Sequence, residues 1–204
     1  MQRVCIFIDG KSFHCGWKAR AQTGPVDWPA LARWLALRLG AEGSHLAARY
    51  YTGIETNERA DSRAQAGLRS FLRHVERSPG YSVHTSGRVP RAFRCGGCGA
   101  RTPTTVEKGI DVSIAVDLLS LALCDGFDRA VLVSGDGDFV PAVEAVRDLG
   151  KPCAVASWGG VGLSARLVAA ASEHIDLAAG ARTFASSLGV GRRRRVIGGS
   201  HSDV

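Results

Sequence analysis

Short apolar runs alternate along the chain with longer segments in which apolar residues recur every three to four positions. The runs are rich in β-branched residues and predict buried strands, and the recurring segments predict amphipathic helices. Predicted strands cover Val4–Ile8, Ala47–Thr52, Tyr81–Val89, Ala130–Ser134, Pro152–Ser157 and His174–Leu177. Predicted helices cover Trp28–Leu39, Asp61–Glu76, Ile110–Leu123, Phe139–Leu149 and Leu163–Ala171. This alternation predicts an α/β fold of Rossmann-like type, a three-layer α/β/α sandwich around a mostly parallel sheet.

The segment from Pro90 to Glu107 breaks the pattern. It contains Gly, Pro, Arg and a Cys-Gly-Gly-Cys run, and it shows no hydrophobic period. It predicts a long loop or insertion, whose length favours a functional role. Because 204 residues suit one domain with an appendage, we expect a domain over residues 1–180 that contains this insertion, and a basic, disordered tail over residues 181–204.

Composition narrows the class of protein. The net charge is +7, which favours encounter with polyanions such as nucleic acid, although Arg192–Arg195 in the tail contribute four of these charges. No segment reaches the roughly 18 uninterrupted apolar residues of a membrane span, and the N-terminus does not resemble a signal peptide. The six cysteines are scattered and predict no disulfide framework. We therefore expect a cytoplasmic protein that does not bind membranes.

Four carboxylates lie at predicted ends of strands and helices. Asp9 ends the first strand, Asp136 and Asp138 follow the strand that ends at Ser134, and Asp111 opens a helix. Each could simply cap a helix or form a turn. Their conjunction at one edge of a parallel sheet, where ligands bind, favours a site instead. Carboxylates suit Mg²⁺ or Mn²⁺, which can activate water and stabilise charge on a phosphate.

Three stretches of sequence carry a resemblance to a known family. They are Phe7-Ile8-Asp9-Gly10, the segment from Lys108 to Leu119, and the segment from Val131 to Phe139 with its Ser-Gly-Asp-Gly-Asp-Phe run. Together they resemble the NYN domain, a branch of the PIN-like nuclease superfamily, over roughly Arg3 to Leu177.

The resemblance implies a PIN-like fold and a ribonuclease activity that depends on Mg²⁺ or Mn²⁺. It assigns both catalysis and metal binding to Asp9, Asp111, Asp136 and Asp138. Asp117 also matches the family pattern, but its offset of six from Asp111 places it on a different helix face, so we interpret it as a supporting residue. The family commonly has Asn where this chain has Ser12, whose hydroxyl has a shorter reach.

Other residues are expected to support the site or to bind the substrate. Supporting roles are predicted for Ser12, Lys108, Ser134 and Asp117, and nucleic-acid contacts for Lys11, Arg91, Arg94 and Arg101. Arg88 belongs to the same basic stretch and would also face phosphates. The Cys95-Gly-Gly-Cys98 run has the spacing of half a zinc ribbon. His14, Cys15 or a second copy of the chain could complete a zinc site, whereas a redox pair and a plain Gly-rich loop are the alternatives.

These observations favour a metal-dependent endoribonuclease that hydrolyses phosphodiester bonds of single-stranded RNA. Asp9, Asp111 and Asp136 would hold Mg²⁺ or Mn²⁺, and Asp138 would complete the acidic cluster. One alternative is a binding or regulatory module of the same fold, which recognises RNA or a protein and is catalytically weak or inactive. A second is a small-molecule phosphatase, although Lys11 stands where an aspartyl-phosphate enzyme would have a second Asp. A homodimer is compatible with each hypothesis.

Overall fold

The computed structural model describes residues 2–20, 24–42, 45–56, 62–160 and 162–186. The strands are β1 (Arg3–Asp9), β2 (His45–Ile54), β3 (Tyr81–Arg94), β4 (Arg101–Glu107), β5 (Arg129–Val133), β6 (Cys153–Ser157) and β7 (His174–Asp176). The helices are α1 (Gly10–Ala19), α2 (Trp28–Arg38), α3 (Arg63–Glu76), α4 (Ile110–Leu123), α5 (Val140–Asp148) and α6 (Ala165–Ala170), with 3₁₀ turns η2 (Gly137–Phe139) and η3 (Leu177–Gly180). Arg192–Arg195 lie outside the described residues.

The described strands form one sheet in the order β4-β3-β2-β1-β5-β6-β7. Neighbouring strands are parallel except β3 and β4, which pair antiparallel from Arg88↔Glu107 to Arg94↔Arg101. Strands β1 and β5 are buried on both faces, as their continuous β-branched runs predict. The predicted α/β class with a mostly parallel sheet is therefore confirmed.

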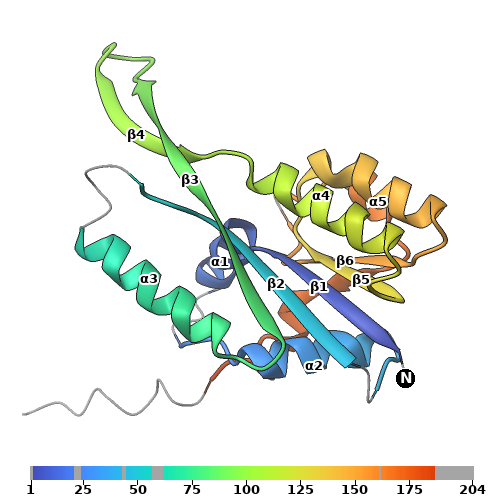
Figure 1. Ribbon diagram of the computed structural model, residues 1–204. Helices are drawn as coiled ribbons and strands as arrows, with labels where there is room; N and C mark the ends of the chain where they lie inside the picture. The colour runs from blue at the N-terminus through green and yellow to red at the C-terminus, as the bar shows by residue number, and fades with distance from the viewer. Residues whose placement is uncertain (1, 21–23, 43–44, 57–61, 161, 187–204) are drawn as a thin grey trace, which may run out of the picture.

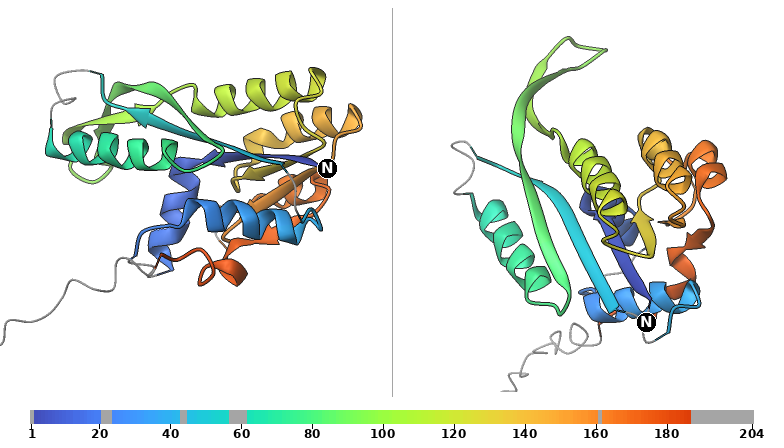
Figure 2. Two further views of the ribbon diagram at one scale, coloured as in Figure 1. Left: turned by 60° about the horizontal axis from the view of Figure 1, so that its bottom comes forward. Right: turned by 45° about the vertical axis from the view of Figure 1, so that its right-hand side comes forward.

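Helices cover the sheet on both faces, which makes three layers (Figure 1, Figure 2). One core lies under α1, α2 and α3 and is rich in aromatic residues, including Phe13, Trp28 and Tyr50. The other lies under α4, α5 and α6 and is built around Phe7 and Phe139. Because alternate side chains of a strand point to opposite faces, Ile6 and Phe7 of β1 enter different cores.

Two segments differ from the sequence-based expectation. Helix α1 was not predicted, and it forms because Asp9 caps its first turn while Phe13 and Trp17 bury one side. The segment predicted as a loop, Pro90 to Glu107, is instead the outer part of a long β3–β4 hairpin that projects from the body (Figure 1). Backbone hydrogen bonds between the two strands stabilise the hairpin, so its sequence needs no hydrophobic period.

Two further findings concern the ends and surface of the domain. Residues 181–186, which were predicted as part of the tail, pack on the body, because Phe184 is fully buried and Ala185 pairs with Val26. Within the described residues, no helix is long and apolar enough to cross a membrane.

Candidate active site

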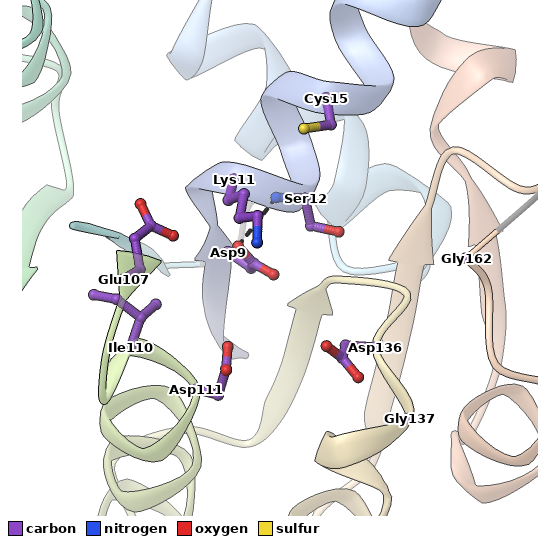
Figure 3. Close-up of a pocket in the computed structure, with 10 residues that line it drawn as sticks. All are labelled: Asp9, Lys11, Ser12, Cys15, Glu107, Ile110, Asp111, Asp136, Gly137 and Gly162. Carbon is purple, nitrogen blue, oxygen red and sulfur yellow. Dashed lines mark hydrogen bonds between the residues drawn. The ribbon is translucent and has the colours of Figure 1, made fainter. Parts of the chain in front are cut away.

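The connections of β1 and β5 leave the sheet in opposite directions. The chain passes from β1 into α1 on one face, and from β5 through η2 into α5 on the other. In a parallel sheet such a switch point leaves a crevice at the carboxyl ends of the two strands. A cavity of about 390 Å³ lies at this place, and four carboxylates line it: Asp9, Glu107, Asp111 and Asp136 (Figure 3).

Asp9 is the buried member of this group, with only 8% of its surface exposed. Its carboxylate accepts hydrogen bonds from the backbone N–H of Ser12 at 3.1 Å and from the hydroxyl of Ser134 at 3.2 Å. Burial nevertheless raises the pKa of Asp9, and the nearby charges of Asp111 and Glu107 raise it further. A cation brought beside Asp9 would therefore stabilise a charge that the fold alone leaves poorly compensated.

Ser134 connects the two loops that form the crevice. Its buried hydroxyl donates to Asp9 and accepts the backbone N–H of Asp136 at 3.2 Å. Asp136 in turn caps η2 by accepting the N–H of Asp138 at 3.0 Å. Asp138 is exposed and does not line the cavity, and it does not cap α5, whose N-cap is Phe139 without a side-chain bond.

Asp111 reaches the cavity from the first turn of α4. The N-cap of α4 is Gly109 in the left-handed region, and it makes no side-chain capping bond, so the capping alternative for Asp111 does not apply. Its pKa is raised by partial burial and then by the charges of Asp136 and Asp138, whereas Lys11 opposes the shift. Asp111 and Asp136 thus share one electrostatic environment although 25 residues separate them in sequence.

Glu107 lines the cavity, and sequence reasoning missed it because its segment was interpreted as a loop. Its carboxylate accepts the N–H of Gly53 at 2.9 Å and forms an ion pair with Arg88 at 3.2 Å. Arg88 also contacts the buried Glu55 at 3.4 Å, so its guanidinium lies between two carboxylates. The prediction that Arg88 faces substrate phosphates is therefore corrected: its charge is already compensated within the hairpin base.

Asp117 lies away from the cavity, as its helix offset predicted. Its carboxylate accepts a hydrogen bond from the hydroxyl of Tyr51 at 2.7 Å and pairs with Arg49 at 2.9 Å. The ring of Tyr51 is fully buried and stacks on His84 with centroids 4.8 Å apart. Asp117 therefore connects α4 to β2.

The predicted basic residues divide into two groups. Lys11 lines the cavity together with Ser12 and Cys15. Arg91, Arg94 and Arg101 lie exposed on the hairpin, outside the cavity lining. Lys108 is exposed as well, and its carbonyl accepts a hydrogen bond from the hydroxyl of Ser86 at 2.7 Å.

A second cavity of about 460 Å³ continues from the first. The two share Ser12, Cys15 and Gly162 in their linings, and the second adds Arg20 and Trp158. Because the two cavities share lining residues, an extended ligand could occupy both.

The carboxylate oxygens around the first cavity are the type of ligand that a hard divalent cation prefers. Among the described residues, no three His, Cys, Asp or Glu side chains are arranged to hold a metal ion together. Mg²⁺ does not require such a cage, because it keeps several waters and is commonly bound through one or two carboxylates and the substrate phosphate. The carboxylate of Asp9 is buried and is hydrogen-bonded by two neutral donors, the N–H of Ser12 and the hydroxyl of Ser134, so a cation beside it would be favourable.

Comparison with known proteins decides the family. The family described as the NYN domain matches residues 3–178, which is most of the chain. The chain belongs to the NYN domain family. This confirms the resemblance seen in the motifs around Asp9, Asp111 and Asp136.

One curated relative and one solved structure extend the comparison. This NYN domain is 30% identical over 176 residues to the "Low amplitude and bright protein LabA" of Synechococcus elongatus, covering 86% of this chain and 83% of that protein. It also superimposes on the crystal structure of a protein of unknown function, VPA0982, from Vibrio parahaemolyticus. That match has a TM-score of 0.55 and 22% identity, and covers 86% of this chain and 93% of the other. At that identity the match supports the fold alone.

Proposed function

We propose that this NYN domain is an endoribonuclease that uses Mg²⁺ or Mn²⁺ to hydrolyse phosphodiester bonds of single-stranded RNA. The observation that carries the proposal is the convergence of four carboxylates, from β1, β4, α4 and the loop between β5 and η2, on one cavity at the switch point of the sheet. Helix capping alone does not explain why all four carboxylates point to the same cavity. Two of them, Glu107 and Asp111, make no helix-capping bond.

Asp9, Asp111 and Asp136 would hold the cation, with Glu107 and Asp138 adding negative charge around them. The cation, when bound, would lower the pKa of a coordinated water and neutralise charge on the phosphate. Ser134 would keep the carboxylate of Asp9 aimed at the cavity through its 3.2 Å hydrogen bond. No covalent intermediate with the protein is required.

Lys11 and Ser12 would act on the phosphate itself. Among the described residues that line the cavity, Lys11 alone is cationic, so it would pair with a phosphate oxygen after the substrate enters. The hydroxyl of Ser12 can donate a hydrogen bond to the same group, although with a shorter reach than Asn. The adjoining cavity beside Trp158 has room for a flanking nucleotide, and exposed Arg91, Arg94 and Arg101 would bind more distant phosphates.

The test is cleavage of a labelled single-stranded RNA by the purified protein with Mg²⁺, Mn²⁺ or EDTA. Asp9→Asn and Asp136→Asn keep the capping geometry, since Asn also caps helices well, but remove a charge from the site. We expect each to reduce the cleavage rate by at least about 100-fold, the scale of losing one preorganised electrostatic group.

A matched control removes the same charge elsewhere. Asp148→Asn alters an exposed carboxylate at the end of α5, whose only ion pair among the described residues is with Arg147 at 3.6 Å. It should leave cleavage unchanged. Cleavage that persists in EDTA, or that survives both site substitutions, would contradict the proposal.

A second candidate, a regulatory module that binds RNA without cutting it, is favoured by one observation. Ser12 lines the cavity where an Asn is common in the family. RNA binding without cleavage across varied RNAs, in a folded protein supplied with Mn²⁺, would favour this candidate over the nuclease.

A further inference from the structure

Cys95 and Cys98 lie at the tip of the β3–β4 hairpin, in a tight turn. The backbone N–H of Cys95 donates to the carbonyl of Ala100 at 2.8 Å, and the N–H of Gly99 donates back to the carbonyl of Cys95 at 2.9 Å. Gly99 has a φ of +70°, a conformation that favours glycine. The two cysteines are therefore held by a defined backbone turn.

The turn brings the two sulfur atoms together. The side chain of Cys98 and the backbone of Gly97 and Cys98 interact with the sulfur of Cys95. The thiolate is the form of cysteine that binds metal. Both cysteines are free, and Cys98 is exposed. This is the arrangement of two ligands in a tetrahedral zinc site.

The remaining two ligands do not come from the described part of the same chain. No group of three metal-binding side chains includes these cysteines among the described residues. The ring of His14, which the sequence offered as a candidate, packs against the rings of Trp28, Tyr50 and Phe71. The hairpin tip projects away from the body (Figure 1), and a side chain added at Gly96 or Gly97 would meet nothing within 4 Å. The turn is thus open to another molecule.

We propose that the hairpin tip binds one Zn²⁺ between two copies of this chain, with Cys95 and Cys98 of each copy as its four ligands. A two-fold axis through the metal would bring the same pair of thiolates from each side, as closed dimers require. Four metal–sulfur bonds, rather than a large protein interface, would offset the translational and rotational entropy that the two chains lose on association. The inference does not require ribonuclease activity, although Arg94 and Arg101 enter both proposals.

The charges around the tip favour this assembly. Zn²⁺ with four thiolates carries a net charge of −2. Arg94 and Arg101 face each other across the hairpin at its last pair, and the guanidinium of Arg94 lies about 3.8 Å from the space above Gly99. Two like charges directly opposite destabilise an isolated hairpin, whereas beside an anionic metal centre they are stabilising. Two copies would place four guanidinium groups around one centre.

The test uses the full chain, reduced, freed of metal with a chelator, and then titrated with Zn²⁺ alone. We expect one Zn²⁺ for every two chains, together with a shift from monomer to dimer in sedimentation velocity. Co²⁺ in place of Zn²⁺ should give the intense sulfur-to-cobalt absorption of a tetrahedral thiolate site. One Zn²⁺ per monomer, no binding, or a Cys95–Cys98 disulfide that persists under reduction would each overturn the proposal.

Substitutions separate this site from other thiols. Cys95→Ser and Cys98→Ser should each abolish the zinc-dependent dimer and weaken zinc binding at least about 100-fold, because each removes two of the four ligands. Cys124→Ser is the matched control, since Cys124 is also an exposed free cysteine but lies at the end of α4. The tip is exposed, so circular dichroism should show unchanged folding. Dimerisation that survives Cys98→Ser would refute the shared site.

Discussion

The contact between Asp117, Tyr51 and Arg49 yields a quantitative test of which acidic residue supports the fold and which belongs to the candidate site. Asp117 matches the family pattern as Asp111 does, yet it bonds to β2 instead of lining the cavity. Replacing Asp117 by Ala removes both bonds. We therefore expect a loss of stability without a direct effect on the chemistry of the site.

The size of this loss follows from the two partners. The hydroxyl of Tyr51 belongs to a fully buried residue and donates to Asp117 at 2.7 Å, so its loss leaves a buried donor unsatisfied, at roughly 1–3 kcal/mol. The pair with Arg49 is about one-third exposed and contributes roughly 0.5–1 kcal/mol. Asp117→Ala should thus lower the free energy of unfolding by roughly 2–4 kcal/mol. Asp117→Asn keeps an acceptor for Tyr51 and should cost about 1 kcal/mol.

Urea unfolding monitored by circular dichroism measures these differences. Tyr51→Phe removes the donor, so in the Asp117→Ala background it should cost less than it does in the wild-type chain. The two changes should depart from additivity by about 1–2 kcal/mol. At a temperature where all variants are folded, Asp117→Asn should retain its RNA cleavage. Wild-type stability in Asp117→Ala, or loss of cleavage in a stable Asp117→Asn, would refute the structural role.

Two further predictions concern the cavity itself. The pKa of Asp9 is raised in the folded state, so over a range of pH the folded protein retains a proton that the unfolded chain releases. The free energy of unfolding of the metal-free protein should therefore fall as the pH rises from about 4 through the raised pKa. Urea titrations at several pH values should show a smaller fall for Asp9→Asn. Arg88→Met should leave the carboxylates of the buried Glu55 and of Glu107 without the cation that pairs with them. We expect the free energy of unfolding to fall by about 2–3 kcal/mol. An unchanged urea midpoint would contradict this.

Most strands and helices of this fold could be predicted from the sequence, because burial of one or both faces fixes the spacing of apolar residues. Strand β5 is buried from Ala130 to Val133 and reads as an uninterrupted apolar run, and Asp27 with Pro29 marks the start of α2 as such residues usually do. Helix α1 gave no such signal. Its first turn contains Gly10, its cap belongs to the preceding strand, and its apolar pattern is limited to Phe13 and Trp17, so its stability comes mainly from tertiary packing.

The candidate site was partly predictable for the same reason. Asp9 and Asp136 follow strands, so the topology of a parallel sheet places them at one edge. Glu107 was missed because the hairpin that carries it is exposed on much of its surface and therefore lacks an alternating pattern. The position of Glu107 depends on pairing with Arg88, a contact 19 residues away that only the folded hairpin defines.

The charge of the cavity also indicates the order in which ligands bind. Within the described part of the chain, its lining holds four carboxylates, Asp9, Glu107, Asp111 and Asp136, and one ammonium group, that of Lys11. An RNA phosphate approaching this set alone would be repelled, although the basic hairpin attracts it to the surface. A divalent cation bound first would cancel part of this negative charge and offer the phosphate oxygens a direct ligand partner. The arrangement therefore predicts that RNA enters the cavity only after the metal, so that EDTA should abolish cleavage while leaving contact with the hairpin arginines intact.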